Sequence, residues 1–267
     1  MDAGAVPLAN PLSADMAVMR TSVLPGLVEA VRRNLNRQQE RVRLFEIGMV
    51  FGNAGDELRQ ITRIAAAACG RAQPESWSTG KAAVDFYDMK ACVESLLGLA
   101  GRGRRIEFRT IDHAWLHPGR SAGVWVDGTV AGFVGELNPR LLRALDIDTA
   151  VQVFELDSGP TTAGVIPRAG ALSRFPSLRR DIAIVVPEDT GYAKIEVAVR
   201  QALGNYLSEL VVFDRYAGPN LGSGVKSLAI GLILQDDSRT LTDEDADRYV
   251  TRALTALERD CHARLRG

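Results

Sequence analysis

The C-terminal part of the sequence constrains the fold most strongly, because two helical patterns alternate with strand patterns there. Apolar residues recur at helical spacing over residues 195–206, and the same stripe returns over residues 246–257. Thr242 and Asp245 have the spacing of a capping box at the start of the second helix. Each apolar stripe has to be buried, so both helices are expected to pack on one face of a sheet. The strands of that sheet are predicted at residues 181–186, 210–216, 228–234 and 262–266.

This order of elements is β-α-β-β-α-β, the ferredoxin-like arrangement. Strand alternation predicts that Ile182, Ile184 and Val186 face the helices. The other side of the sheet carries smaller residues, such as Ala183 and Ala229, and therefore leaves room for a flat ligand. Proteins with this fold bind RNA, bind regulatory ligands or form oligomers, so the fold alone does not decide the function.

The preceding residues predict a second α+β domain. A helix is expected after Pro25, because Leu27, Val28, Val31 and Leu35 follow at helical spacing. Asp127-Gly128 is a strong hairpin signal between two strands. Strands are predicted at residues 41–51, 61–69, 106–110, 122–126, 130–136 and 151–156, with helices at residues 86–99 and 141–145.

Residues 158–171 differ in composition from both flanking regions. They hold two prolines and three glycines, with hardly a large apolar side chain. We place the domain boundary there, with one domain at residues 1–160 and the other at residues 172–267. Strong pattern begins almost at the first residue, so we expect the sequence to be part of a longer protein.

Composition excludes several classes of protein. Hydrophobic residues make up 46% and charged residues 24%, as in soluble globular proteins. No apolar run approaches the roughly 20 residues that span a bilayer, and the first ten residues lack the pattern of a secretory signal. We therefore expect a cytoplasmic protein with no membrane partner. Residues 172–267 carry 13 Lys/Arg and 14 Asp/Glu, so any RNA contact has to come from a local patch.

Cysteines and histidines give no sign of a metal site. Cys69, Cys92 and Cys261 show no CxxC spacing, and we expect buried free thiols in a reducing cytosol. His113 and His117 would share a helix face only if a helix ran past the proline at position 118, which we do not expect. We predict no metal ligands in this chain.

Other motifs also fail as catalytic sites. The glycine-rich residues 218–227 are not a phosphate loop, because Val225 separates Gly224 from Lys226 and a strand follows. The acidic residues 243–247 open a helix, where negative charge favours the helix dipole. Glu46 and Glu136 lie in or beside strands and are possible functional carboxylates, although no partner spacing singles them out.

Three arginines near the first helix allow two interpretations. Arg33, Arg37 and Arg41 recur every fourth residue and would share one polar face if the helix continued that far. That face is either simply solvated or in contact with a partner subunit or a phosphate backbone. The solvated face is the interpretation that we favour.

A series of short blocks, in order along nearly the whole chain, resembles the C-terminal part of the phenylalanyl-tRNA synthetase beta-subunit family. In the first domain the blocks are NPLSADMAVMRTSVLPGL at residues 10–27, RLFEIG at 43–48, DFYDMK at 85–90, HPGRS at 117–121 and GELNP at 135–139. In the second domain they are FPSLRRDI at residues 175–182, FDRY at 213–216, KSL at 226–228, RTLTD at 239–243 and LRG at 265–267.

The resemblance implies a catalytically empty, class II synthetase-like antiparallel sheet domain, followed by a ferredoxin-fold anticodon-binding domain. Class II enzymes hold the ATP α-phosphate with an arginine in a Phe-Arg-x-Glu strand motif. The comparable strand here reads Arg43-Leu-Phe-Glu46, out of register with that motif, and residues 132–139 lack the arginine of the third class motif. No catalytic residue is therefore expected in this chain, since such cations stabilise the leaving pyrophosphate.

The partners implied are the alpha subunit of the synthetase and the tRNA for phenylalanine, in an (αβ)₂ heterotetramer. ATP and magnesium would be used by the full enzyme, and no cofactor is expected in this chain. The alternative from a different class is a stand-alone ferredoxin-like binding or regulatory module without a synthetase partner. An independent enzyme on the class II scaffold would need ATP-binding arginines that the sequence lacks.

Recognition of the anticodon is expected on the sheet face and adjoining loops of the second domain, where bases stack on aromatic rings and arginines meet phosphates. Tyr216 is the best stacking candidate, and Arg179 and Arg180 are the best phosphate candidates. Phe213 is interpreted as a core residue, and a pairing of Arg180 with Asp181 is an alternative. The RNA-binding candidates are Phe175, Arg179, Arg180, Tyr216, Lys226 and Arg239.

Overall fold

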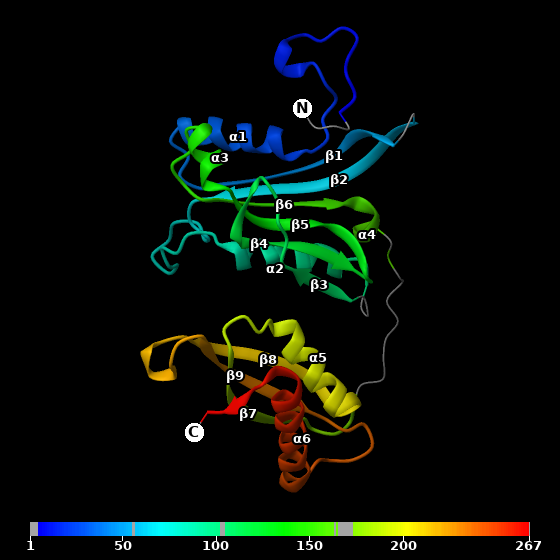
Figure 1. The fold of residues 1–267 in the computed structure, drawn as a ribbon, viewed down its shortest axis with the longest axis vertical. Coiled ribbons are helices and arrows are strands. Elements are labelled where there is room, and N and C mark those ends of the chain that lie inside the picture. The colour runs from blue at the N-terminus through cyan, green and yellow to red at the C-terminus, as the bar shows by residue number, and fades with distance from the viewer. Residues whose placement is uncertain (1–4, 55–56, 102–104, 163, 165–172, 267) are drawn as a thin grey trace. The chain divides into compact units, whose positions relative to one another are not determined.

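A computed structural model describes the chain except for residues 1–4, 55–56, 102–104, 163, 165–172 and 267 (Figure 1). The chain forms two compact units, residues 1–168 and 169–267, and each is described by itself. Most of the predicted boundary segment, residues 158–171, lies outside the described residues. Its described start forms a short helix, α4 (Ser158–Thr162).

The first unit is built on a six-stranded antiparallel sheet with the order β1-β2-β6-β5-β4-β3. The predicted strand at residues 122–126 is longer than expected and begins at Leu116, because a break in register between Leu116 and Ser121 accommodates Pro118. The strands are β1 (Val42–Ala54), β2 (Glu57–Cys69), β3 (Ile106–Arg109), β4 (Leu116–Val126), β5 (Thr129–Leu137) and β6 (Val151–Asp157).

Helices cover both faces of this sheet. Val153 of β6 belongs to the core beneath α1 (Leu24–Asn36), whereas the next residue, Phe154, belongs to the core beneath α2 (Phe86–Gly98). Successive strand residues point to opposite faces, so the two helices lie on opposite sides. A third helix, α3 (Pro139–Ala144), follows β5.

Local sequence signals explain where these elements start and end. Asp127 and Gly128 both have positive φ, 50° and 82°, which is the backbone of the tight hairpin that the sequence predicts. The helix does not continue far enough to give one basic face, because α1 ends at Asn36 and Arg37 is already its C-terminal cap. Arg33 instead pairs with Glu29 on the same helix, at 2.9 Å.

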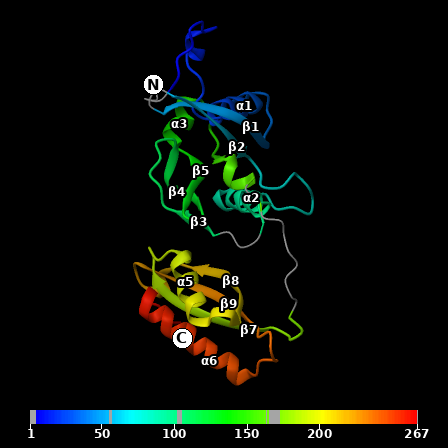
Figure 2. The ribbon, with the colours of Figure 1, turned by 90° about the vertical axis from the view of Figure 1, so that its right-hand side faces the viewer.

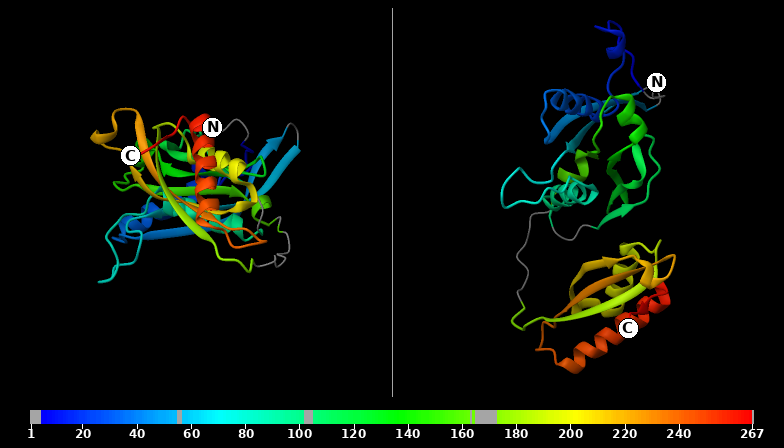
Figure 3. Two further views of the ribbon diagram at one scale, coloured as in Figure 1. Left: turned by 90° about the horizontal axis from the view of Figure 1, so that it is seen from below. Right: turned by 90° about the vertical axis from the view of Figure 1, so that its left-hand side faces the viewer.

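The second unit has the predicted β-α-β-β-α-β order. Its antiparallel sheet runs β10-β7-β9-β8, the strand order of a ferredoxin-like fold. Both helices pack on one face of this sheet (Figures 2 and 3). The capping box of Thr242 and Asp245 opens α6 as predicted. The elements are β7 (Leu178–Pro187), α5 (Tyr192–Leu203), β8 (Leu207–Tyr216), β9 (Val225–Leu234), α6 (Asp243–Cys261) and β10 (Arg264–Leu265), with single turns of 3₁₀ helix at Ala14–Met16, Gly204–Tyr206 and Pro219–Leu221.

The three cysteines are free, as expected, but they are not all buried. Cys69 and Cys261 are buried, and burial raises the pKa of both thiols. Cys92 is exposed on the outer side of α2, which corrects the expectation for that residue. None of the described helices combines the length and the apolar character needed to cross a bilayer.

Candidate functional site

The four-stranded sheet of the second unit has one face covered by helices and one open face. Ile184, Ile230 and Leu232 point toward the helices and are fully buried. The intervening residues of β7 and β9 point the other way, and Ala183 pairs directly with Ala229 at the middle of that side. We call this side, formed by the odd-numbered residues of β7 and β9 and their neighbours on β8 and β10, the open face. The side chains of Ala183 and Ala229 at its centre are small, so the sheet backbone there lies close to the surface.

Gly231 keeps the open face clear at one point and lets two charged side chains lie across it. A Cβ atom at this position would stand 3.1 Å from Asp181 Oδ1 and 3.2 Å from Arg179 Nε. Arg179 donates from Nε to Asp181 Oδ1 at 2.8 Å. The glycine therefore provides the space in which this ion pair rests.

Arg179 also lies over an exposed aromatic ring. Its guanidinium carbon is 5.2 Å from the centre of the Phe213 ring, within the range of a cation–π contact. The interpretation of Phe213 as a core residue is wrong, because 50% of this residue is exposed. The physical reason is the irregular register of β8 between Val212 and Asp214, which leaves Phe213 out of the ladder on an edge strand.

A second pair of the same kind stands at Tyr216. The guanidinium carbon of Arg266 is 5.4 Å from the centre of the Tyr216 ring, and its Nη1 donates to Ser227 Oγ at 3.4 Å. Ser227 is the register partner of Tyr216, so the three side chains share the open face. Arg264 lies on the same face, because it is exposed and pairs with Val185.

Sequence reasoning missed Arg264 and Arg266. The backbone N–H of Arg266 donates to the carbonyl of Ala183 at 2.8 Å, which fixes the last residues against β7. The available signal was the alternation Arg-Leu-Arg in a predicted final strand, which puts both arginines on one face. Their common face is set by the register with β7, and a two-residue strand does not reveal this register by itself.

Arg180 and Arg239, two of the predicted RNA-binding residues, lie elsewhere. Arg180 follows Arg179 and points toward the helices, where it pairs with Asp243 and with Asp247, the latter at 3.6 Å. The alternative pairing with Asp181 is therefore also wrong. Arg239 donates from Nη1 to the buried carboxylate of Asp245 at 2.6 Å. Both arginines thus form ion pairs with carboxylates at the N-terminus of α6.

The carboxylate of Asp245 is the centre of that cluster. The hydrogen bond from Arg239 and the backbone N–H of Thr242 hold the pKa of Asp245 well below its usual value. Arg248 also pairs with this carboxylate, at 2.7 Å. These contacts hold the first turn of α6.

Lys226 and Phe175 lie at the ends of strands. Lys226 donates from Nζ to the carbonyl of Glu188 at 2.7 Å, beyond the end of β7. Phe175 is half-buried, and its carbonyl accepts from Gln235 Nε2 at 2.8 Å. Of the six predicted residues, Arg179 and Tyr216 are thus the two that register and contacts bring to the open face. RNA binding by any of the six stays a prediction.

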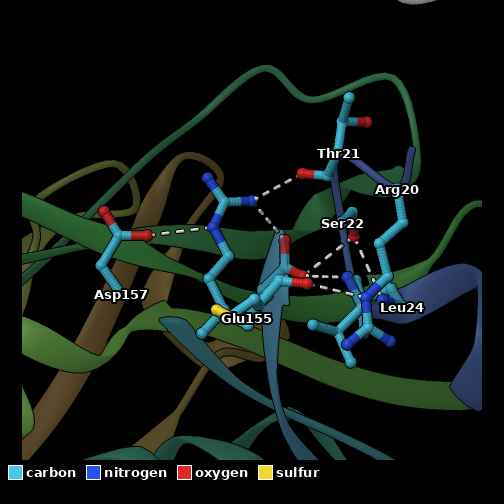
Figure 4. A network of polar contacts seen from close by, with 9 residues as sticks. Arg20, Thr21, Ser22, Leu24, Glu155 and Asp157 are labelled. Atoms are coloured by element: carbon cyan, nitrogen blue, oxygen red, sulfur yellow. Dashed lines mark hydrogen bonds and ion pairs between the residues drawn. The ribbon is translucent and has the colours of Figure 1, made fainter. Parts of the chain in front are cut away.

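The first unit contains a polar network around Glu155, a buried residue of β6 (Figure 4). Its carboxylate accepts from Ser22 Oγ at 2.9 Å, from the backbone N–H of Val23 at 2.6 Å and from Arg63 Nη1 at 2.8 Å. Arg63 also bonds to Asp157 Oδ1 at 3.0 Å. The network fastens the segment that leads into α1 to the middle of the sheet.

The carboxylates singled out in the sequence are neutralised by arginines. Arg20 pairs with Glu46 at 2.6 Å and also donates to the carbonyl of Met49 at 2.8 Å. Arg120 pairs with Glu136 at 3.0 Å. A site for triphosphate needs cations free to meet it, and Arg20 and Arg63 are each engaged with carboxylates. These ion pairs therefore have a structural role, because they hold neighbouring segments of the first unit together.

Comparison with known proteins gives one family match for each unit. The family described as "Phenylalanyl tRNA synthetase beta chain CLM domain" matches residues 1–158. The family described as "Ferredoxin-fold anticodon binding domain" matches residues 173–266. Both matches agree with the resemblance seen in the sequence.

Curated relatives extend the comparison along the chain. The phenylalanine–tRNA ligase beta subunit of Xanthomonas oryzae pv. oryzae (strain MAFF 311018) is 47% identical over 99% of this chain and 34% of the relative. That of Xanthomonas campestris pv. campestris (strain 8004) is 48% identical over 99% and 33%. That of Xylella fastidiosa (strain 9a5c) is 46% identical over 100% and 34%. The chain therefore spans about a third of the length of these relatives.

Proposed function

The chain belongs to the phenylalanyl-tRNA synthetase beta-chain family, and from this premise we propose that its second unit binds the anticodon of a phenylalanine tRNA through the open face. The observation that carries the proposal is the composition of that face. Two arginine–aromatic pairs, Arg179–Phe213 and Arg266–Tyr216, lie at the edges of a shallow centre. Rings and guanidinium planes are the groups on which unpaired bases stack, and arginines also meet phosphates.

The first unit is a non-catalytic structural counterpart of the catalytic domain in the alpha subunit, and it docks on that subunit. In this proposal the alpha subunit holds the active site, where ATP and magnesium are used, and the full enzyme is a cytoplasmic (αβ)₂ heterotetramer. The pairing of Arg20 and Arg63 with carboxylates supports the absence of catalysis here. Pyrophosphate exchange with phenylalanine and ATP should therefore stay at background for this chain alone, and activity in a preparation free of alpha subunit would contradict this.

Exposed apolar side chains on β1 support a docking role for the first unit. Phe45, Ile47 and Met49 are 75%, 61% and 50% exposed and share one face of the strand. Among the described strands, β1 pairs only with β2, so it is an edge of the sheet. Exposed apolar groups of this kind on an edge strand mark a surface that another protein covers.

A stand-alone binding module accounts for less of what is observed. It would explain the ferredoxin-like second unit, whereas the family match also extends over residues 1–158. Co-expression with an alpha subunit tests the difference, since a stand-alone module would not co-purify with it. Arg33, Arg37 and Arg41 do not lie on one helix, so the proposal rests on β1.

The decisive test of anticodon recognition is a gel-shift titration of the 267-residue chain. The probes are a phenylalanine tRNA and the same tRNA with an altered anticodon. We expect the unaltered tRNA to bind at least tenfold more tightly. Equal affinity for both would remove anticodon recognition from this chain.

A further inference from the structure

The described helices leave one end of the six-stranded sheet uncovered on the α2 side (Figure 1). Val42 and Val50 of β1 belong to the core beneath α1, so the odd-numbered residues of this strand point to the α2 side. Among these residues Phe45, Ile47 and Met49 are each at least half exposed. We call these three side chains the apolar row.

The uncovered stretch has the width of one helix. α2 packs on β5 and β6, and the next strands in the sheet are β2 and then β1. Neighbouring strands lie about 4.8 Å apart, so the line between β2 and β1 is about 10 Å from the line between β6 and β5. Helices packed side by side are also about 8–10 Å apart. A helix on β1 and β2 would therefore lie directly beside α2.

The strand next to the apolar row leaves room for such a helix. Ala66 and Ile64 of β2 are the register partners of Phe45 and Ile47, and both are only partly buried. α4 also contacts β2. It begins after Asp157, so it lies toward the hairpin that joins β2 to β1 and away from the first residues of β1.

Two arginines without a carboxylate partner lie at one end of the apolar row. Arg41 and Arg43 are exposed and precede Phe45 on the same side of β1. Their Nη2 atoms donate to the same carbonyl oxygen, that of Ala72, at 3.4 and 2.8 Å. Within the described residues neither arginine forms an ion pair, whereas Arg63 bonds to two carboxylates. Two guanidinium groups that converge without a counter-charge favour a carboxylate supplied by a partner.

The outer edge of β1 is less suited to a partner than this face, because another segment of the chain covers part of it. The backbone N–H of Phe51 donates to the carbonyl of Arg20 at 2.8 Å. Arg20 Nε donates to the carbonyl of Met49, also at 2.8 Å. A Cβ atom at Gly48 would stand 2.3 Å from Arg20 Nη2, so this side chain crosses the strand there. Only a short part of the edge is left for pairing with a partner strand.

We propose that an amphipathic helix of the ligase alpha subunit lies on this face of β1 and β2, beside α2. Its apolar stripe covers the apolar row, and acidic side chains at one end of the helix meet Arg41 and Arg43. From Arg43 to Met49 the strand spans about 20 Å, which corresponds to about 13 residues of helix. RNA fits less well, because Ile47 and Met49 offer no ring on which a base could stack. The inference rests on the docking of the first unit on the alpha subunit that is proposed above.

Photo-crosslinking of the 267-residue chain, co-expressed with a phenylalanine–tRNA ligase alpha subunit, tests this proposal. p-Benzoylphenylalanine takes the place of Phe45, and the same probe in place of Phe213 in the second unit is the matched control. We expect the probe at position 45, and not that at position 213, to crosslink to an alpha-subunit segment with apolar residues at helical spacing and acidic residues at one end. A crosslink to a different kind of segment, to a second copy of this chain or to tRNA would overturn the proposal.

The same experiment separates this inference from the docking on which it rests. If the alpha subunit co-purifies and the probe at position 45 gives no crosslink, docking stands and the helix on β1 is refuted. If the alpha subunit does not co-purify with the unaltered chain, the proposed docking itself fails, and the helix fails with it.

Two substitutions test the apolar and the charged contacts separately. Phe45→Ser and Arg43→Glu should each weaken binding of the purified alpha subunit at least tenfold in biolayer interferometry. Arg140→Glu is the matched control for charge, because this exposed arginine belongs to α3 on the α1 side of the sheet, and it should bind within twofold. Changing an acidic residue of the crosslinked segment to lysine should restore binding to Arg43→Glu. Unchanged affinity in Phe45→Ser and Arg43→Glu variants that thermal unfolding shows to be folded would also overturn the proposal.

Discussion

Replacing Phe213 by alanine tests the open face most directly. Half of the residue is exposed, and it does not belong to the core cluster of the second unit. Substitution of a core phenylalanine costs about 3–5 kcal/mol of unfolding free energy, so this half-exposed ring should cost roughly half as much or less. The variant is therefore expected to fold.

The effect on RNA binding should be larger than the effect on folding. A base stacked on an aromatic ring contributes about 1–3 kcal/mol to binding. A loss of about 1–3 kcal/mol corresponds to roughly 5–150-fold weaker binding. Arg179 would also lose the ring on which its guanidinium rests, so we expect Phe213→Ala to fall in the upper half of that range.

Fluorescence anisotropy with a labelled anticodon stem–loop measures this affinity at one fixed salt concentration. Phe45→Ala is the matched control, because this phenylalanine is 75% exposed and lies in the first unit. The control should bind the RNA within twofold of the unaltered chain. If Phe213→Ala also binds within twofold while its unfolding midpoint shows a folded protein, the ring does not stack with a base, and the proposed role of the open face fails.

Three further outcomes are expected. Arg264→Ala and Arg266→Ala should each weaken binding of all RNA sequences about equally and reduce the slope of log affinity against log salt by about one. Asp245→Asn should lower the free energy of unfolding at neutral pH, because Arg239 depresses the pKa of this carboxyl in the folded state. The stabilisation that the carboxylate provides is present above its unfolded pKa and is lost as the pH falls through its folded pKa. Thermal unfolding should therefore show the midpoints of the variant and of the original chain converging in acid. A thiol reagent should label Cys92 alone in the folded chain and all three cysteines in denaturant, and fast labelling of a second thiol under native conditions would contradict the burial seen here.

The fold of the second unit could be predicted because its signals are local. The helical stripe of α6 and the capping box of Thr242 each lie within one element, and the structure contains both. The first stripe is shorter than predicted, because α5 ends at Leu203 and Tyr206 lies in the 3₁₀ turn that follows. Strand alternation correctly assigned Ile182, Ile184 and Val186 to the helix side. The same rule separates Arg179 from Arg180, so the different faces of these two arginines could have been predicted as well.

The candidate site could be predicted only in part, because its remaining contacts depend on tertiary pairing. The irregular register that exposes Phe213 arises from the pairing of β8 with β9, and no residue type in the segment FDRY predicts it. Arg63 and Glu155 are 92 residues apart in sequence and meet only because β2 pairs with β6. The partners of a charged residue on a strand are thus set by strand order, which periodicity does not provide.

The charge pattern of the second unit is compatible with the proposed binding of RNA, although the unit has no basic excess. Its acidic residues at the start of α6 pair with Arg180, Arg239 and Arg248, all away from the open face. Arg179 and Arg266 instead rest on aromatic rings of the open face. Net charge measures the sum of both groups, whereas an RNA on the open face would meet the second group together with Asp181, which pairs with Arg179 there. Because so few cations face the RNA, the salt dependence of binding should be shallow, and specificity has to come from stacking and base contacts rather than from bulk attraction.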